Sequence, residues 1–400
     1  MSTEIFSHKL ANGMVLIGEP ITSVESAAFT FLLPAGCSHD PAGGAGLASL
    51  TNEMMLRGAG PRDSRTWVSD LENLGVERGE SVGVAQATFH GATLRDNLAP
   101  GLGLFADMLR RPHLPADQLD AGRSACLQEL RAIDDEPSHK LMIELRRRQY
   151  PDPWGRSSHG EEAPLRKAKI GDVRKFHETH YQPSGTIMAV AGNFDWKRLC
   201  DLVEQLFGDW EPIDVAEPSE TNGRPEGNYI PFESNQSHVG IAYPTIPYKH
   251  PDYFQAWAAV GVLSSGSSSR LFTEVREKRG LCYTVYASLH TQRDRASVLC
   301  YAGTTAERAQ ETLDVTVSEL KRLGQGIEQS ELNRLKARIK SSLIMQQEST
   351  SARSGALARD WYHLGRVRTL DEVGAMVDAL SAESFNAFLQ KKSASRFAGC

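Results

Sequence analysis

The chain has 400 residues, 24% of them charged, and a formal net charge of −6. This length allows two domains of ordinary size, and the mixed charges argue against a nucleic-acid-binding surface. No apolar run is long enough to cross a membrane. The first twelve residues, MSTEIFSHKLAN, lack the basic and then apolar pattern of a signal peptide. We therefore expect a cytoplasmic protein, or a periplasmic one if a leader has been removed.

The first half of the chain alternates between strand and helix patterns. Runs rich in apolar and β-branched residues predict strands over residues 27–33, 81–94 and 186–191, and a hairpin over residues 8–17 that turns at Asn12-Gly13. Apolar residues at helical spacing predict helices over residues 48–56, 65–74, 98–109, 115–133, 170–180 and 195–207. Residues 215–228 are rich in Pro, Glu and Gly, and we expect them to link the two halves.

The second half repeats this order. Strands are predicted over residues 239–243, 282–289 and 296–302, and helices over residues 253–263, 271–275, 305–323, 327–345 and 380–392. The helix pair after Asp96 corresponds to the pair after Thr305, which predicts a duplicated α+β domain over residues 1–214 and 229–400. In the first half, the helix that ends at His180 is followed by the strand over residues 186–191, whereas the second half stops soon after the helix over residues 380–392. We expect the matching strand of the second half to be cut off or only begun.

The six cysteines are scattered through the chain. They are Cys37, Cys126, Cys200, Cys282, Cys300 and Cys400, with no C-x-x-C pair and no zinc-finger spacing. We therefore expect reduced and mostly buried thiols.

The stretch RLFTEVREKRGLCYTVYA, residues 270–287, contains two polar side chains of interest. Arg276 lies near the end of a short helix and Tyr283 at the start of a strand, and a turn at Gly280 can bring them side by side. A guanidinium and a phenol hydroxyl together can hold carbonyl oxygens or a developing oxyanion. The alternative is an ordinary surface arginine and a core tyrosine.

The pattern R-L-F-x-x-x-R-E-x-x-G-L-x-Y in this stretch resembles the second-half signature of the pitrilysin family of zinc peptidases, which includes insulin-degrading enzyme and the mitochondrial processing peptidase. The family has an inverted H-x-x-E-H zinc motif. The resemblance implies an α+β fold of two homologous domains, each a mostly antiparallel sheet packed with helices. It also implies that Arg276 and Tyr283 face the zinc and bind substrate next to the scissile bond.

The zinc motif itself is changed in this chain. Where the family has G-L-A-H-F-L-E-H-M-L-F-K-G, residues 46–58 read G-L-A-S-L-T-N-E-M-M-L-R-G. Ser49 and Glu53 replace the two histidine ligands, Asn52 replaces the general base, and Glu129 falls at the third ligand. Zinc prefers nitrogen and sulfur ligands, and a neutral amide cannot act as a base near pH 7. We expect a relic site without metal. The alternative is an oxygen-ligated ion at Ser49, Glu53 and Glu129.

A second histidine pattern, His177-Glu178-Thr179-His180, resembles a metal motif only in its spacing. No third ligand is near it in the sequence, and Tyr181-Gln182-Pro183 ends the helix directly. We expect a structural role for both histidines.

The resemblance and the lost ligands together imply a non-catalytic, substrate-binding subunit of a heterodimeric zinc peptidase that cleaves peptides. This chain would bind no cofactor and would be inactive alone. A homologous H-x-x-E-H partner would supply the zinc and the base, while Arg276 and Tyr283 would contribute to that partner's active site. Two alternatives keep the fold without catalysis. One is a scaffold, like the core subunits of the respiratory cytochrome complex, and the other is a peptide-binding homodimer.

Overall fold

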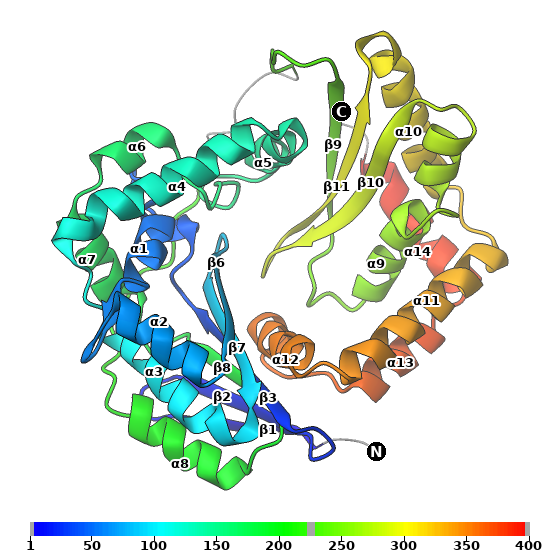
Figure 1. Ribbon diagram of the computed structural model, residues 1–400. Helices are drawn as coiled ribbons and strands as arrows, with labels where there is room; N and C mark the ends of the chain where they lie inside the picture. The colour runs from blue at the N-terminus through cyan, green and yellow to red at the C-terminus, as the bar shows by residue number, and fades with distance from the viewer. Residues whose placement is uncertain (1–3, 222–228, 397–400) are drawn as a thin grey trace. The chain divides into compact units, whose positions relative to one another are not determined.

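The computed structural model describes residues 4–221 and 229–396, and the chain forms two compact units (Figure 1). Unit 1 comprises residues 1–133, 152–222 and 346–367, and unit 2 comprises residues 134–151, 223–345 and 368–400. Part of the predicted linker, residues 222–228, lies outside the described residues. Within the described ranges, the helices are all too short or too polar to span a bilayer.

Unit 1 is built on a six-stranded sheet. The strand order is β1 (Phe6–Lys9), β2 (Val15–Pro20), β8 (Ile187–Gly192), β3 (Ser26–Leu33), β7 (Ala87–Leu94) and β6 (Glu77–Val82). Only β2 and β8 are parallel, which confirms the mostly antiparallel sheet. The prediction of one strand over residues 81–94 is wrong. A turn in which the Gly83 N–H donates to the Gln86 carbonyl, at 2.7 Å, divides this region into β6 and β7.

One face of this sheet supports the main core of unit 1. The helices on this face are α1 (Leu47–Met55), α2 (Ser64–Asn73), α3 (Leu98–Arg110), α4 (Leu119–Asp134), α6 (Glu162–Lys167), α7 (Ile170–His180) and α8 (Trp196–Phe207). Phe29 and Phe31 of β3 point into this core, where Phe29 meets the Phe105 ring edge-on at 4.8 Å. A two-stranded ribbon, β4 (Gly58–Ala59) and β5 (Arg62–Asp63), follows α1.

The opposite face of the same sheet is covered by α12 (Thr350–Leu364), which comes from far along the chain. Ile187, Ala189 and Ala191 of β8 pack against Leu357 and Ala358 of this helix. The intervening residues of β8 point into the main core, since side chains alternate along a strand. Burial on both faces explains why β8 is apolar at every position.

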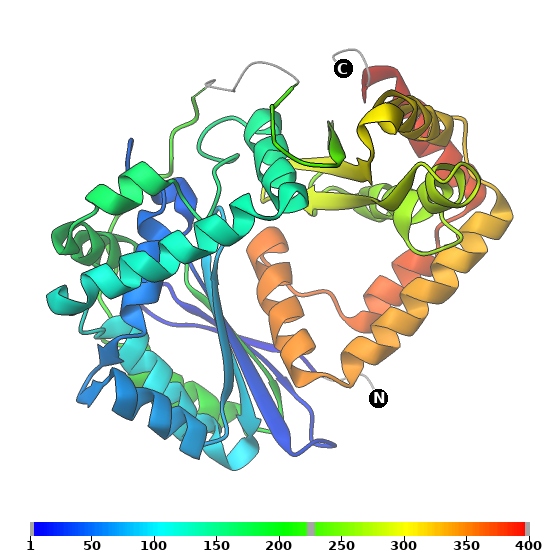
Figure 2. The same cartoon turned by 45° about the horizontal axis from the view of Figure 1, so that its top comes forward.

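Unit 2 has a three-stranded antiparallel sheet in the order β10 (Cys282–Thr291), β11 (Ala296–Thr304) and β9 (Ser237–Thr245). One face packs against a helical core formed by α9 (Tyr253–Ser264), α10 (Ala309–Leu323), α11 (Gln329–Gln347), α13 (Leu370–Asp378) and α14 (Ala382–Arg396). On the other face, Leu299 and Tyr301 of β11 pack against Met142 of α5 (Pro137–Gln149) (Figure 2).

The two halves of the sequence therefore exchange a helix. In the chain, α5 follows α4 and α12 follows α11, so they occupy matching places in the two halves. Each helix comes from one half of the sequence and covers the second face of the sheet that the other half forms. The predicted domains, residues 1–214 and 229–400, do not include this exchange of helices. The exchange arises because both faces of each sheet are apolar, and a helix is needed to keep water from the second face.

Candidate functional site

The structure brings Arg276 and Tyr283 together on unit 2. The Arg276 guanidinium carbon lies 4.9 Å from the centre of the Tyr283 ring and 4.7 Å from the centre of the Phe272 ring. The cation therefore lies within reach of two aromatic faces, an attractive arrangement that holds the guanidinium in place. The turn between the two residues is made by Gly280, which has a φ of 58° as expected for a helix-ending glycine.

Two irregular backbone segments present this pair. The short helix η4 (Phe272–Glu277) is a π-helix rather than the α-helical turn expected from the sequence, and Lys278 N–H donates to the Thr273 carbonyl five residues back. In β10, the register with β11 shifts between Cys282 and Thr284, so Tyr283 occupies a β-bulge. Bulges re-aim side chains, and Tyr283 is 80% exposed, so the core-tyrosine alternative is wrong.

The polar atoms of the pair are available for a ligand. The nearby carboxylate of Glu274 is bound by Lys278 at 2.7 Å and Arg279 at 2.8 Å, and these hydrogen bonds lower its pKa. Within the described residues, the Arg276 side chain has no ion pair and the Tyr283 hydroxyl has no hydrogen bond. The Arg276 guanidinium and the Tyr283 hydroxyl thus remain free to bind carbonyl or carboxylate oxygens.

Arg270, the first residue of the signature stretch, has a different role that the sequence analysis missed. Its side chain is buried, and it donates to both Glu331 oxygens, at 2.7 and 2.8 Å, and to the Gly326 carbonyl. Burial opposes ionisation of Glu331, but the Arg270 guanidinium, the Glu328 N–H and the charge of Arg322 together outweigh it, so the pKa of Glu331 is lowered. This pair fixes η4 against α11 and thereby supports Arg276.

On unit 1, the altered zinc motif lies on α1 and its side chains contact other groups. The Ser49 hydroxyl donates to the Ser158 carbonyl, and Glu53 forms an ion pair with Arg57 at 2.6 Å. Asn52 is buried, and its side-chain oxygen has no hydrogen-bond partner among the residues described. An amide and a hydroxyl are poor zinc ligands, so these residues do not fit a zinc ion.

The third predicted ligand position, Glu129 on α4, lies next to a residue that sequence spacing did not single out. Its carboxylate is 3.7 Å from the imidazole of His159. Cys126 is close to both carboxylates of the relic site, and burial together with Glu53 and Glu129 raises the pKa of its thiol to about 12. Throughout the described part of the chain, no three His, Cys, Asp or Glu residues form a metal-binding group.

Gly122 of α4 lies against Met54 of the altered zinc motif on α1. A β-carbon built at Gly122 would lie 2.6 Å from the Met54 sulfur, so Met54 fills the space that a longer side chain on α4 would need. An acidic residue there, which could orient a metal ligand on α1, would require Met54 to move.

The start of α1 is held by Asp40, whose carboxylate accepts the N–H groups of Gly46 and Ala48 at 2.7 and 2.8 Å. Burial raises the pKa of Asp40 to about 6, although both hydrogen bonds and the nearby Arg156 act in the opposite direction. This carboxyl group organises the helix that carries the relic motif.

The two histidines of the second pattern, His177 and His180, lie in different environments. His177 is buried and its Nε2 is bonded to the Leu109 carbonyl at 2.9 Å. His180 packs against the rings of His39 and Phe176, each at 4.5 Å, and burial and the neighbouring His39 lower its pKa to about 4. Both side chains are thus part of the packing around α7. Five cysteines are free thiols, four of them buried; Cys400 lies outside the described residues.

Comparisons with known proteins place this arrangement in a family. The model of the insulinase family (peptidase family M16) matches residues 19–157, and that of the peptidase M16 inactive domain matches residues 167–339. An uncharacterized zinc protease of Mycobacterium bovis is 26% identical over 94% of this chain and 88% of its own length. One from Bacillus subtilis is 25% identical over 94% and 92%.

Solved structures share the fold. A peptidase M16 inactive domain from Pseudomonas fluorescens has a TM-score of 0.85 at 24% identity, covering 97% of this chain and 94% of that chain. A protease from Helicobacter pylori has a TM-score of 0.87 at 20% identity, covering 98% and 97%. The two family models together span well over half of the sequence, and the chain belongs to the M16 (insulinase) family of peptidases.

Proposed function

We propose that this chain is the non-catalytic, substrate-binding subunit of a two-chain zinc peptidase. The observation that carries the proposal is the contrast between its two halves. On unit 2, Arg276 and Tyr283 are held together with free polar atoms. On unit 1, Ser49 and Glu53 occupy the positions of the histidine ligands and Asn52 that of the general base, and none of the three is suited to its role in a zinc site.

The chemistry of the pair suits the recognition of a peptide backbone. The Arg276 guanidinium can donate two hydrogen bonds to one carbonyl oxygen or to neighbouring carbonyl oxygens. The Tyr283 hydroxyl can donate to the oxygen that becomes negative when the peptide bond is attacked. The attacking water and its activation would come from a homologous chain with an intact H-x-x-E-H motif.

Co-expression with such an H-x-x-E-H chain tests the proposal. We expect the two chains to co-purify, zinc to be found only in the partner, and chelator-sensitive peptide hydrolysis to require both chains. Elemental analysis of each separated chain, native mass spectrometry and a peptide-cleavage assay measure these three properties.

Two results would contradict the proposal. Stoichiometric zinc and chelator-sensitive cleavage in this chain alone would make it an enzyme in its own right. A stable homodimer that binds peptides but excludes the H-x-x-E-H chain would instead favour the peptide-binding alternative.

A further inference from the structure

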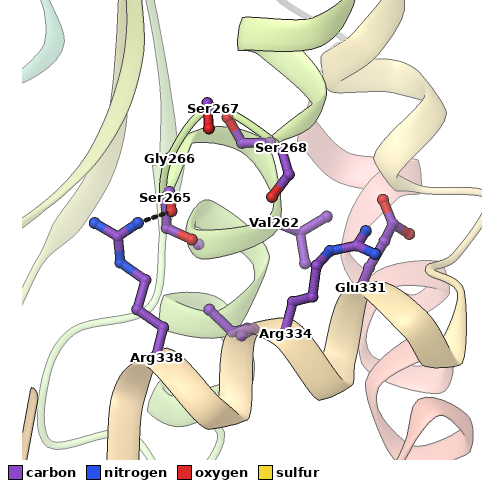
Figure 3. A pocket seen from close by; sticks show the side chains of 11 residues that line it. Val262, Ser265, Gly266, Ser267, Ser268, Glu331, Arg334 and Arg338 are labelled. Atoms are coloured by element: carbon purple, nitrogen blue, oxygen red, sulfur yellow. Dashed lines mark hydrogen bonds between the residues drawn. The ribbon is translucent and has the colours of Figure 1, made fainter. Parts of the chain in front are cut away.

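A small cavity in unit 2 lies between the loop of residues 265–269 and helix α11, and it has no place in the peptide-binding proposal. Its volume is about 190 Å³. Serine residues Ser265, Ser267 and Ser268 line one side, and Arg334 and Arg338 of α11 line the other (Figure 3).

The cavity carries a net positive charge. Glu331 is the only acidic residue in its lining, and the two hydrogen bonds from Arg270 neutralise that carboxylate. Arg334 has neither an ion pair nor a hydrogen bond within the described part of the chain. Two guanidinium groups, one turn apart on the same helix face, therefore lie at the cavity without a counter-charge.

The loop of residues 265–269 packs closely against Arg338. Arg338 donates to the Ser265 carbonyl, which holds the guanidinium at the cavity wall (Figure 3). Gly266 has a φ of 128°, and a β-carbon there would lie 2.6 Å from the Arg338 Nη1 atom. Glycine is thus required both by the backbone conformation and by the approach of the arginine.

The remaining donors of the loop are also unused. Among the described residues, the N–H groups of Gly266, Ser267 and Ser268 and the hydroxyls of the two serines make no hydrogen bond. The cavity combines these donors with the free N–H groups of two arginines. A carboxylate has two oxygens, whereas a phosphate group has three or four. A phosphate group can therefore accept hydrogen bonds from more of these donors than a carboxylate can.

We propose that this cavity binds a phosphate group, either as the free ion or as part of a phosphate ester. The site is independent of the proposed peptidase role. It is formed by α11, the serine-rich loop and the end of α9, and its lining includes neither Arg276 nor Tyr283.

Isothermal titration of the full chain with inorganic phosphate, against sodium chloride at equal ionic strength, tests this proposal. We expect saturable phosphate binding. Arg334→Gln should weaken it about tenfold or more, because hydrogen bonds to charged groups contribute at least that factor. Ser267→Ala and Ser268→Ala should weaken it less. Lys321→Gln removes the same charge from an exposed site on α10 and should leave the affinity unchanged.

Further titrants identify the source of the phosphate. Tighter binding of O-phosphoserine than of inorganic phosphate would support the proposal and identify a phosphate ester, whereas the reverse order would support it and identify the free ion. The proposal is overturned if phosphate binding does not saturate, if Lys321→Gln weakens it as much as Arg334→Gln does, or if acetate binds as tightly as phosphate.

Discussion

At the residue scale, the buried Arg270 and the partly buried Glu331 form an ion pair that joins the start of the signature stretch to α11. We expect Arg270→Ala to lower the free energy of unfolding by about 2–3 kcal/mol, because it removes two charge-assisted hydrogen bonds and leaves a partly buried carboxylate without its guanidinium. Denaturant unfolding followed by circular dichroism measures this loss.

Arg279→Ala is the matched control for this experiment. Arg279 also binds a carboxylate, that of Glu274, but its side chain is 41% exposed. Exposed ion pairs contribute at most about 1 kcal/mol, so the control should be close to wild type. Equal losses in the two variants would show that burial of the Arg270 pair has no special importance.

Asp40 makes the stability of unit 1 depend on pH. Its pKa is about 6 in the folded chain, above the ordinary value of 3.8, so the folded state binds more protons between these values. The contribution of Asp40 to stability therefore falls as pH rises from about 4 to 6, by about 1.4 kcal/mol per pH unit.

Asp40→Asn should remove this dependence while keeping one oxygen that can accept an N–H group. The free energy of unfolding of the wild type, relative to that of the variant, should decrease by roughly 2 kcal/mol between pH 4.5 and 7. Unfolding curves at several pH values test this, and a difference that stays constant with pH would refute the raised pKa.

The sequence predicted the proximity of Arg276 and Tyr283 from the turn at Gly280 and from the family resemblance. It did not predict the exposure of Tyr283, because the bulge depends on the pairing of β10 with β11, which no local pattern encodes. The role of Arg270 was missed for a similar reason. Its partner lies 61 residues away.

At the scale of elements, the exchanged helix α12 is held to the unit 1 sheet by polar as well as apolar contacts. Arg353 forms an ion pair with Glu19 of β2 at 2.6 Å, and both side chains are almost fully buried. The Ser354 hydroxyl is 3.0 Å from that of Thr30 on β3.

Single substitution of the buried pair should destabilise unit 1. We expect Arg353→Ala to cost about 3–5 kcal/mol, since the buried Glu19 carboxylate would lose the guanidinium that neutralises its charge. The double variant Glu19→Leu/Arg353→Met should regain most of this loss, because well-packed apolar residues often replace a buried ion pair without cost. A double-mutant cycle of unfolding free energies measures both effects, and additive losses would show that the two side chains do not interact.

Most of the strands and helices were predictable from local patterns, but neither exchanged helix was. In α5 only Met142 is buried, and the buried face of α12 includes Thr350, Arg353, Ser354 and Asp360. Such faces lack the apolar stripe by which an amphipathic helix is predicted. Their packing depends on sheets that are distant in the sequence, so no window of local sequence indicates it.

At the scale of the whole molecule, the chain combines the M16 fold with the Arg276/Tyr283 pair on unit 2 and with Ser49, Asn52 and Glu53 in the altered zinc motif on unit 1. In the complex with an H-x-x-E-H partner, Arg276→Ala should lower kcat/KM with the zinc content of the partner unchanged, because the arginine positions substrate. Steady-state peptide hydrolysis and elemental analysis measure the two quantities. A fall in the zinc content of the partner that accounts for the whole loss of activity would show that Arg276 acts on assembly instead.

The most direct test of the account is the turnover of the Tyr283→Phe variant in that complex. Tyr283 is exposed and the change removes only a hydroxyl, so folding and assembly should be unaffected. Loss of one oxyanion donor lowers kcat by about 100- to 1000-fold, and we predict a decrease of that order at unchanged melting temperature and zinc content. Full turnover in a stable, zinc-loaded complex would contradict the assignment and favour a scaffold role for the chain.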